Sequence, residues 1–436
     1  MRTEPGFWNP LVLSLWFAGA WPGLGAESVV LPVPSVQPVP ADSPANQASY
    51  EPARPGLLEW HDFKLFPRAT AAMVYDDNIT IQPANRQADL IWSFSPGGTL
   101  MAGSPGVDIP QGTRFEALRM LGRQPYLDAD AQPAKLFLLD YAPNFRLFTS
   151  HGQYSGVDES ALLTAVYSFA RLTLGLDQDY VKVLSAMSDV GTLTEVQTLK
   201  TRVTAKYDLS DRTSLEVNDQ YLNTSYQSNN LFGSRQWVNQ DWLNRKVFSQ
   251  VTAGLGLDLE YWEIDRNPSQ TSEQVLARAI YWLASKLELA VSAGPEWRQY
   301  GGNAPATLEP VFNLAGTFYP RDSTTVTLEG HRVPQPSAYA SADFILTGFS
   351  LALRQRLAAR WAVALTSGYD RAQYHATTTP ASANRSDDYF NTRLGLDYGL
   401  SRRWLGSVFY QYREDFSNLA IGFHDNRTGV QASWRF

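Results

Sequence analysis

The chain has no cysteine, only five histidines among its 436 residues, and no long apolar run. Without cysteine it can form neither disulfides nor an iron–sulfur centre, and it has no thiol for a lipid anchor. Beyond the first residues, no segment approaches the roughly 20 apolar residues that a spanning helix needs. A net charge of −7 argues against a nucleic-acid partner, which favours a clustered basic face. We expect no cofactor.

The amino-terminal region has the composition of a targeting segment followed by a linker. Residues 1–26 carry Arg2, an apolar stretch over 11–21 and small residues ending at Ala26, which predicts a secretory signal peptide. Leu24 occupies the third position before the predicted cleavage site, where a small residue is usual, so cleavage one residue away is the alternative. Residues 27–60 are proline-rich and predict an extended periplasmic linker rather than a docking peptide.

The last ten residues alternate between apolar and polar side chains. Because side chains of a strand point to opposite faces in turn, one face suits lipid and the other suits water. The lipid-type face carries Thr428, Val430, Ala432, Trp434 and Phe436, and the other carries Arg427, Gly429, Gln431, Ser433 and Arg435. A strand that ends in an aromatic carboxy-terminus is typical of the closing strand of an outer-membrane β-barrel. We therefore expect Trp434 and Phe436 to form the signal for the barrel-assembly machinery.

Short turn signals recur along the chain, and each pair is separated by two alternating stretches and a longer polar segment. Short periplasmic turns and longer extracellular loops are characteristic of transmembrane up-and-down barrels. Residues 61–436 therefore predict an all-β, antiparallel barrel of about 18 strands in the outer membrane of a Gram-negative-type bacterium, with 16 strands still possible. The predicted strands are 64–77, 90–103, 135–149, 159–168, 171–183, 193–207, 213–225, 236–244, 247–263, 273–283, 287–299, 308–319, 324–333, 345–357, 361–374, 388–400, 404–416 and 427–436.

Aromatic residues of the lipid face gather at the strand ends, as the two membrane interfaces require. One predicted girdle holds Tyr207, Phe318, Trp361, Trp404 and Phe436, and the other holds Tyr180, Tyr221, Tyr261, Trp297, Tyr369 and Tyr412. Asp219 falls on the lipid face by alternation, so we expect a bulge or a different register at that point.

The opposite face predicts the wall of an aqueous channel, because an 18-stranded barrel is too wide for its side chains to fill. Cations and acids are nearly balanced there, which favours cross-strand ion pairing over a selectivity device. The polar loops either stack sugars on their aromatic residues or simply solvate the rim. The predicted cations of this face are Arg146, Arg171, Lys200, Arg202, Lys206, Arg278, Arg298, Arg354, Arg356, Arg393, Arg413, Arg427 and Arg435, and the acids are Asp140, Asp177, Asp179, Glu216, Asp258, Glu260, Glu288, Glu296, Glu329, Asp370 and Asp397.

Residues 104–134 interrupt the strand pattern on the periplasmic side. Thr113 begins a helical pattern that places Phe115, Leu118 and Leu121 on one face and stops at Gly122. An amphipathic helix needs a surface for its apolar face, so we expect this insertion to gate the pore or to dock a periplasmic partner. Simple packing against the barrel mouth is the alternative.

Three motifs near the first strands carry a family resemblance: Tyr75-Asp76-Asp77-Asn78, Asp89 with its neighbours, and Ser95-Pro96-Gly97. Together with segments downstream they resemble the outer-membrane porins encoded in exopolysaccharide gene clusters, often called beta-barrel porin 2. The resemblance covers roughly residues 60–436. It implies a channel that releases a polysaccharide with a periplasmic polysaccharide-export protein as partner, and it implies no catalytic residues.

The Tyr75–Asn78 motif predicts a turn that ends a strand, because Asp and Asn side chains can close such a turn through hydrogen bonds to the backbone. Asp76, Asp77 and Asn78 offer oxygen ligands for calcium, but the rest of an EF-hand loop is missing, so no metal is expected.

Export of an exopolysaccharide is the main functional prediction, favoured over a diffusion porin by the periplasmic insertion. The alternatives are a passive porin for small solutes and a structural barrel subunit of a larger envelope complex. A TonB-dependent receptor is excluded because the stretch before the first strand is too short for a plug. Glu329 and His331 share one face of a strand, but that spacing is common in a polar wall, so no catalysis is expected.

Overall fold

The computed structural model describes residues 58–60, 62–103, 135–187 and 192–435, apart from 229, 284–285, 303, 322, 339–341, 378–384, 402 and 420. The predicted signal peptide, most of the linker, the insertion at 104–134 with Phe115, Leu118 and Leu121, and Phe436 lie outside these residues.

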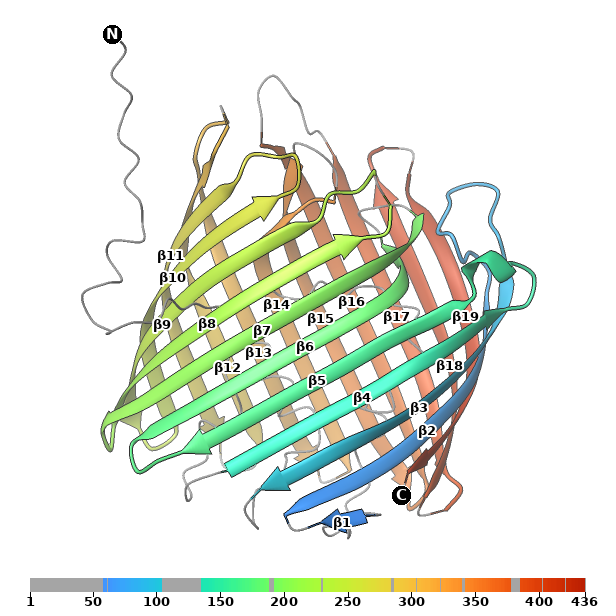
Figure 1. Ribbon diagram of the computed structural model, residues 1–436, viewed down its shortest axis with the longest axis horizontal. Coiled ribbons are helices and arrows are strands. Elements are labelled where there is room, and N and C mark those ends of the chain that lie inside the picture. The colour runs from blue at the N-terminus through green and yellow to red at the C-terminus, as the bar shows by residue number, and fades with distance from the viewer. Residues whose placement is uncertain are drawn as a thin grey trace.

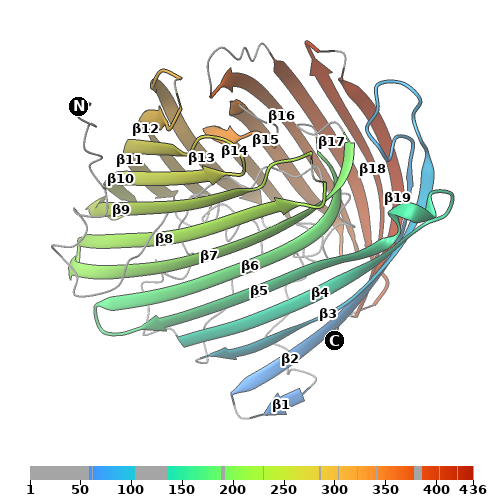
Figure 2. The same cartoon turned by 45° about the horizontal axis from the view of Figure 1, so that its top comes forward.

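Eighteen long strands form one closed antiparallel sheet, in which each strand pairs with its neighbours in the chain. The first long strand, β2, closes the ring by pairing with the last, β19 (Figures 1 and 2). The strands are β2 (Phe63–Asp76), β3 (Asp89–Gly103), β4 (Lys135–Phe148), β5 (Gly156–Ser168), β6 (Leu172–Met187), β7 (Thr192–Ser210), β8 (Thr213–Tyr226), β9 (Ser234–Phe248), β10 (Val251–Ile264), β11 (Gln270–Leu283), β12 (Leu287–Tyr300), β13 (Thr307–Arg321), β14 (Thr324–Pro336), β15 (Ala342–Ala358), β16 (Trp361–Ala376), β17 (Ser386–Gly399), β18 (Trp404–Ser417) and β19 (Phe423–Arg435).

The predicted barrel is confirmed, and each predicted strand overlaps one observed strand. The two strands with blurred alternation, at 159–168 and 236–244, are longer than predicted: β5 begins at Gly156, and β9 runs from Ser234 to Phe248. A short strand, β1 (Leu58–Trp60), lies inside the segment predicted as linker and pairs with the start of β2.

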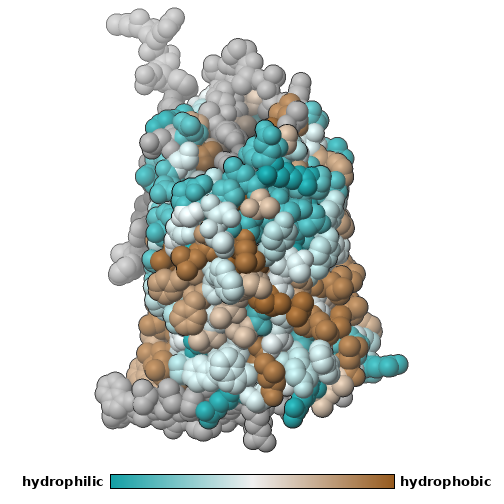
Figure 3. Space-filling model, turned by 90° about the vertical axis from the view of Figure 1, so that its right-hand side faces the viewer, coloured by the Kyte–Doolittle hydropathy of each residue, from teal (hydrophilic) through white to brown (hydrophobic). Residues whose placement is uncertain are grey.

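Alternation along the strands separates an apolar outer face from a polar inner face. On β10, Leu255 is 67% exposed on the outside, whereas its neighbours Asp258 and Glu260 are buried on the other face. Figure 3 shows one side of the barrel, where apolar side chains form a band across the wall with hydrophilic side chains above it. A band of this kind around a closed sheet suits lipid, so the barrel belongs in an outer membrane.

None of the helices in the described ranges is long and apolar enough to cross a membrane.

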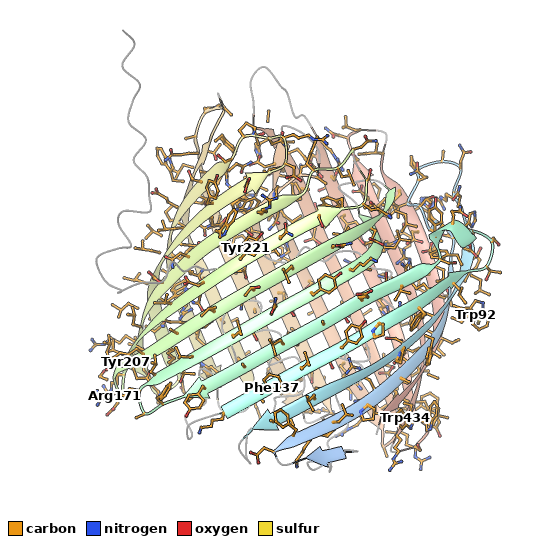
Figure 4. The ribbon with its side chains drawn as sticks, in the orientation of Figure 1. Trp92, Phe137, Arg171, Tyr207, Tyr221 and Trp434 are labelled. Carbon is orange, nitrogen blue, oxygen red and sulfur yellow. The ribbon has the colours of Figure 1, made fainter. Side chains whose placement is uncertain are left out.

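Aromatic side chains mark both rims of the band. Trp237 lies 5.3 Å from Tyr221 and 5.7 Å from Tyr261 between ring centroids, which forms a row across β8, β9 and β10. Tyr207 lies at the opposite rim of the same wall (Figure 4). These two levels agree with the predicted girdles.

The prediction of a bulge at Asp219 is wrong. Asp219 pairs in regular register with Val203 on β7 and Asn239 on β9, and its side chain accepts a hydrogen bond of 3.1 Å from the Asn239 amide. The outward face therefore carries a carboxylate within the apolar band, next to a second one from Asp241. The side-chain hydrogen bond offsets part of the cost of this position without a change of register.

Candidate functional site

The inner face of the barrel holds most of the side chains that the sequence predicts to line a pore. The half-buried ones are Lys200, Lys206, Arg354, Arg393, Arg435, Asp140, Asp177, Asp179 and Glu329. The buried ones are Arg146, Arg202, Glu216, Asp258, Glu260, Arg278, Glu288, Glu296, Arg298, Asp370, Asp397, Arg413 and Arg427.

Arg171 does not lie on the wall. Phe169 to Arg171 form the turn before β6, where the Phe169 amide donates to the Leu172 carbonyl. The Arg171 side chain is therefore exposed at the periplasmic rim (Figure 4). Arg356 is also exposed, but it belongs to β15, close to the turn at that strand's periplasmic end.

A buried ion pair organises the inner wall over β8 to β11. Arg278 Nη2 lies 2.5 Å from Glu216 Oε2, and Arg278 Nε donates to Asn244 Oδ1 at 2.9 Å. The guanidinium also lies 4.1 Å above the Trp242 ring. The cation is thus satisfied by charge, amide and aromatic face together, which compensates for its removal from water.

A second group repeats this arrangement toward the extracellular side. Arg298 contacts Glu296 at 2.8 Å, donates to Gln270 at 2.9 Å and lies 4.8 Å from the Trp262 ring. The Trp262 indole in turn donates to Glu260 at 2.6 Å. The cations and acids of this wall therefore form ion pairs, both across strands, as in Arg278 with Glu216, and along one strand, as in Arg298 with Glu296.

A third group joins the first and last strands. Arg427 Nε lies 2.9 Å from Asp76 Oδ2 and 3.1 Å from Asp425 Oδ2, and Arg413 also pairs with Asp425. The Asp76 carboxylate accepts a hydrogen bond from the backbone N–H of Asn78. This hydrogen bond closes the turn that the sequence motif predicts. This turn lies beside the seam at which the barrel closes.

Asp76, Asp77 and Asp425 are close enough together for a metal ion. Two arginines, Arg413 and Arg427, already contact this group, however. The side-chain amide of Asn78 donates to the carbonyls of Gln82 and His424. The arrangement fits an ion-pair network with fixed cations.

The remaining motif residues hold the backbone together. Asp89 accepts hydrogen bonds from the amides of Thr149, Ser150 and His151 and so anchors the loop after β4. Ser95 donates to the Pro143 carbonyl at 2.9 Å, and a Cβ on Gly97 would lie 3.0 Å from the Tyr141 carbonyl oxygen. Pro96 pairs with Ala69 in the sheet. These contacts give the motif residues a structural role.

The β14–β15 hairpin bends into the barrel at the extracellular side. Pairing of β14 with β13 ends at Arg332, whereas its pairing with β15 continues to Pro336. The consecutive residues Phe344, Ile345 and Leu346 are all buried, so both faces of this hairpin are covered. Tyr300 of β12 donates to Asp343 at 3.0 Å and fastens the bent hairpin to the wall.

The β6–β7 hairpin approaches from the other side of the barrel. Pairing of β5 with β6 ends at Lys182, but β6 and β7 stay paired up to Met187. Val196 of β7 packs against Ala338, which follows β14, and Ala338 accepts a hydrogen bond from the Phe232 amide. Because β7 and β14 lie far apart in the closed sheet, these contacts cross the mouth and narrow it.

A third segment, residues 77–88, completes this set of mouth contacts. Ile81 is fully buried against Tyr389 of β17 and Phe423 of β19, and Leu193 of β7 packs on the same cluster. The sequence predicts polar loops that either stack sugars or solvate the rim. It does not predict the contacts of Ile81 and Ala338, because their neighbours come from strands that only the closed sheet brings near.

Glu329 and His331 each contact a residue of another strand. His331 Nε2 lies 3.1 Å from Asp370 on β16, and Glu329 accepts a hydrogen bond from Ser350 on β15. Each side chain therefore belongs to a different cross-strand contact.

No family model and no curated protein matches the sequence. Among solved structures, the chain is similar to outer-membrane proteins of Pseudomonas aeruginosa and Acinetobacter baumannii. OccK2 (OpdF) of P. aeruginosa, solved in complex with glucuronate, matches with 10% identity and a TM-score of 0.44 over 86% of this chain and 98% of that one. OccAB3 of A. baumannii matches with 8% identity and a TM-score of 0.44 over 85% and 99%. OccK11 (OpdR) of P. aeruginosa matches with 11% identity and a TM-score of 0.41 over 85% and 96%. Identities and TM-scores this low do not show which solutes this chain binds.

Proposed function

We propose that the barrel is a passive channel for small polar solutes across the outer membrane. The observation that carries this proposal is the closed 18-stranded sheet with an apolar outer band and an inner face of charged and amide side chains. A barrel of this strand number is wide enough for a water-filled path, and a polar wall replaces part of the hydration of a passing solute. The mouth contacts restrict this path to small molecules, because they cross the opening.

Export of an exopolysaccharide with a periplasmic polysaccharide-export partner stays the alternative. It rests on the family resemblance and on the insertion at 104–134, which lies outside the described residues. Within the described residues, the inward hairpins favour the diffusion channel, since a polymer needs a wider mouth than a small solute.

Purified protein in planar bilayers separates these functions. A diffusion channel conducts both as the full chain and after deletion of residues 108–130. A gated exporter conducts only after the deletion. Absence of current in both forms would contradict either channel and would favour a structural subunit of an envelope complex.

A further inference from the structure

Charged side chains on the inner face of one wall are sorted by their height in the barrel. The wall comprises β15 to β19 and β2, and its extracellular half carries buried carboxylates with fewer guanidinium groups between them. Arg385, Arg413 and Arg427 pair with members of this set. The carboxylates are Asp76, Asp343, Asp370, Asp387, Asp415 and Asp425.

The periplasmic half of the same wall has the opposite charge. Among the described residues of this half, the inner face holds one carboxylate, Asp397, which lies 3.4 Å from Arg354. Arg68 pairs at 2.5 Å with Asp140 of β4, outside this wall. Arg393 packs 3.7 Å from the Phe409 ring centroid. The cations of this half are Lys64, Arg68, Arg354, Arg356, Arg393 and Arg435.

The wall over β8 to β12 does not cancel this difference. Its acids and arginines alternate along the axis, with Glu216 beside Arg278 nearer the periplasm and Glu296 beside Arg298 nearer the outside. These two walls together therefore have an acidic outer half and a basic inner half.

Fixed charges in a narrow aqueous passage enrich ions of the opposite sign over about one Debye length, roughly 10 Å at 0.1 M salt. The extracellular half thus concentrates cations, and the periplasmic half concentrates anions. When the extracellular side is positive, each kind of ion enters through the half that concentrates it, so both accumulate in the lumen. At the opposite polarity each ion must enter through the half that repels it, and the lumen is depleted.

We infer that the channel rectifies, and that it passes more current when the extracellular side is positive. The inference rests on the proposed function, because it requires an open lumen. It assigns Arg356, Arg393 and Arg435 as residues that set the direction of easy ion flow.

The test is a current–voltage curve of single full-length channels in symmetric KCl. The orientation of each channel in the bilayer is determined with an Asn230→Cys variant. The native chain has no cysteine, and this exposed position in an extracellular loop reacts with an impermeant thiol reagent only from the chamber that it faces. At 0.1 M KCl we expect the current at positive extracellular potential to be at least about twofold larger than at the reverse potential. The ratio should fall toward one at 1 M KCl, where the Debye length is about 3 Å.

The triple variant Arg356→Gln, Arg393→Gln and Arg435→Gln should lose the asymmetry. A matched triple variant at the exposed periplasmic turns, Arg171→Gln, Arg212→Gln and Arg360→Gln, removes the same charge outside the lumen and should keep it. Open channels with equal currents in both directions, the opposite sign, or equal loss in both triple variants would overturn the inference and leave the channel intact. No current in any variant would overturn the proposed channel itself, and the inference with it.

Discussion

Arg427 Nε lies 2.9 Å from Asp76 Oδ2, and this buried ion pair joins the last strand of the barrel to the first. Backbone pairing between β19 and β2 runs from Arg427↔Asp76 to Arg435↔Arg68, so the pair stands at the extracellular end of the seam. Closure of the sheet therefore depends on side-chain charges as well as on the backbone ladder at this end.

Replacement of Arg427 by Met should destabilise the barrel by about 3–5 kcal/mol, because it leaves Asp76 and Asp425 buried with too little positive charge. The measurement is urea unfolding of the purified protein in lipid vesicles. Glu195→Gln is the control, since its pair with Lys182 spans 3.6 Å and is partly exposed. That change should cost less than about 1 kcal/mol. Equal losses in the two variants would show that the seam pair has no special weight.

Asp219 offers a change that should stabilise the barrel. Its carboxylate faces outward within the apolar band, so Asp219→Leu removes a polar group from lipid and should raise the unfolding free energy by about 1–2 kcal/mol in vesicles. Asp211→Leu at an exposed periplasmic turn is the control and should have little effect. A destabilised Asp219→Leu barrel would mean that the hydrogen bond from Asn239 outweighs the cost of the carboxylate.

Gly256 is needed beneath Trp242. A Cβ at this position would lie 2.6 Å from the nearest atom of the indole ring. The ring cannot move away, because the Arg278 guanidinium stacks on it at 4.1 Å from the ring centroid. Gly256→Val should therefore cost about 1–3 kcal/mol of stability and shift tryptophan fluorescence. Gly395→Ala is the control, since its nearest neighbours would lie 3.9 Å and 4.0 Å from the new Cβ.

The mouth contacts predict a gain of conductance. Ile81→Asp places an uncompensated charge against Tyr389 and Phe423, which should release residues 77–88 and raise single-channel conductance by about half or more. Ala84→Asp adds the same charge at an exposed position of the same loop and should leave conductance near the native value. Unchanged conductance in both variants would show that this loop does not restrict the path.

The sequence predicts the sheet well because alternation is a local property. Leu255 and Asp258 show their faces through their immediate neighbours, so the strand order and the two surfaces follow without any tertiary information. Strand ends are less certain. Asp387 and Asp425 lie just outside the predicted strands, which begin at 388 and 427, whereas the observed strands begin at Ser386 and Phe423. Asp387 and Asp425 were therefore not predicted to face the lumen.

The mouth contacts could not be predicted in this way. Ile81 and Ala338 stand in short polar segments that look like ordinary loops, and their partners lie on distant strands. Only the closed ring fixes which loops face one another across the opening.

Thiol labelling of two single-cysteine variants in lipid vesicles tests the central claim most directly. Thr366 lies on the inner face of β16 and is exposed there, whereas Leu394 lies on the outer face of β17 and is 51% exposed. In a lipid-embedded barrel with a hydrated lumen, a charged thiol reagent modifies Thr366→Cys and leaves Leu394→Cys unmodified. Modification of Leu394→Cys with protection of Thr366→Cys would contradict the account.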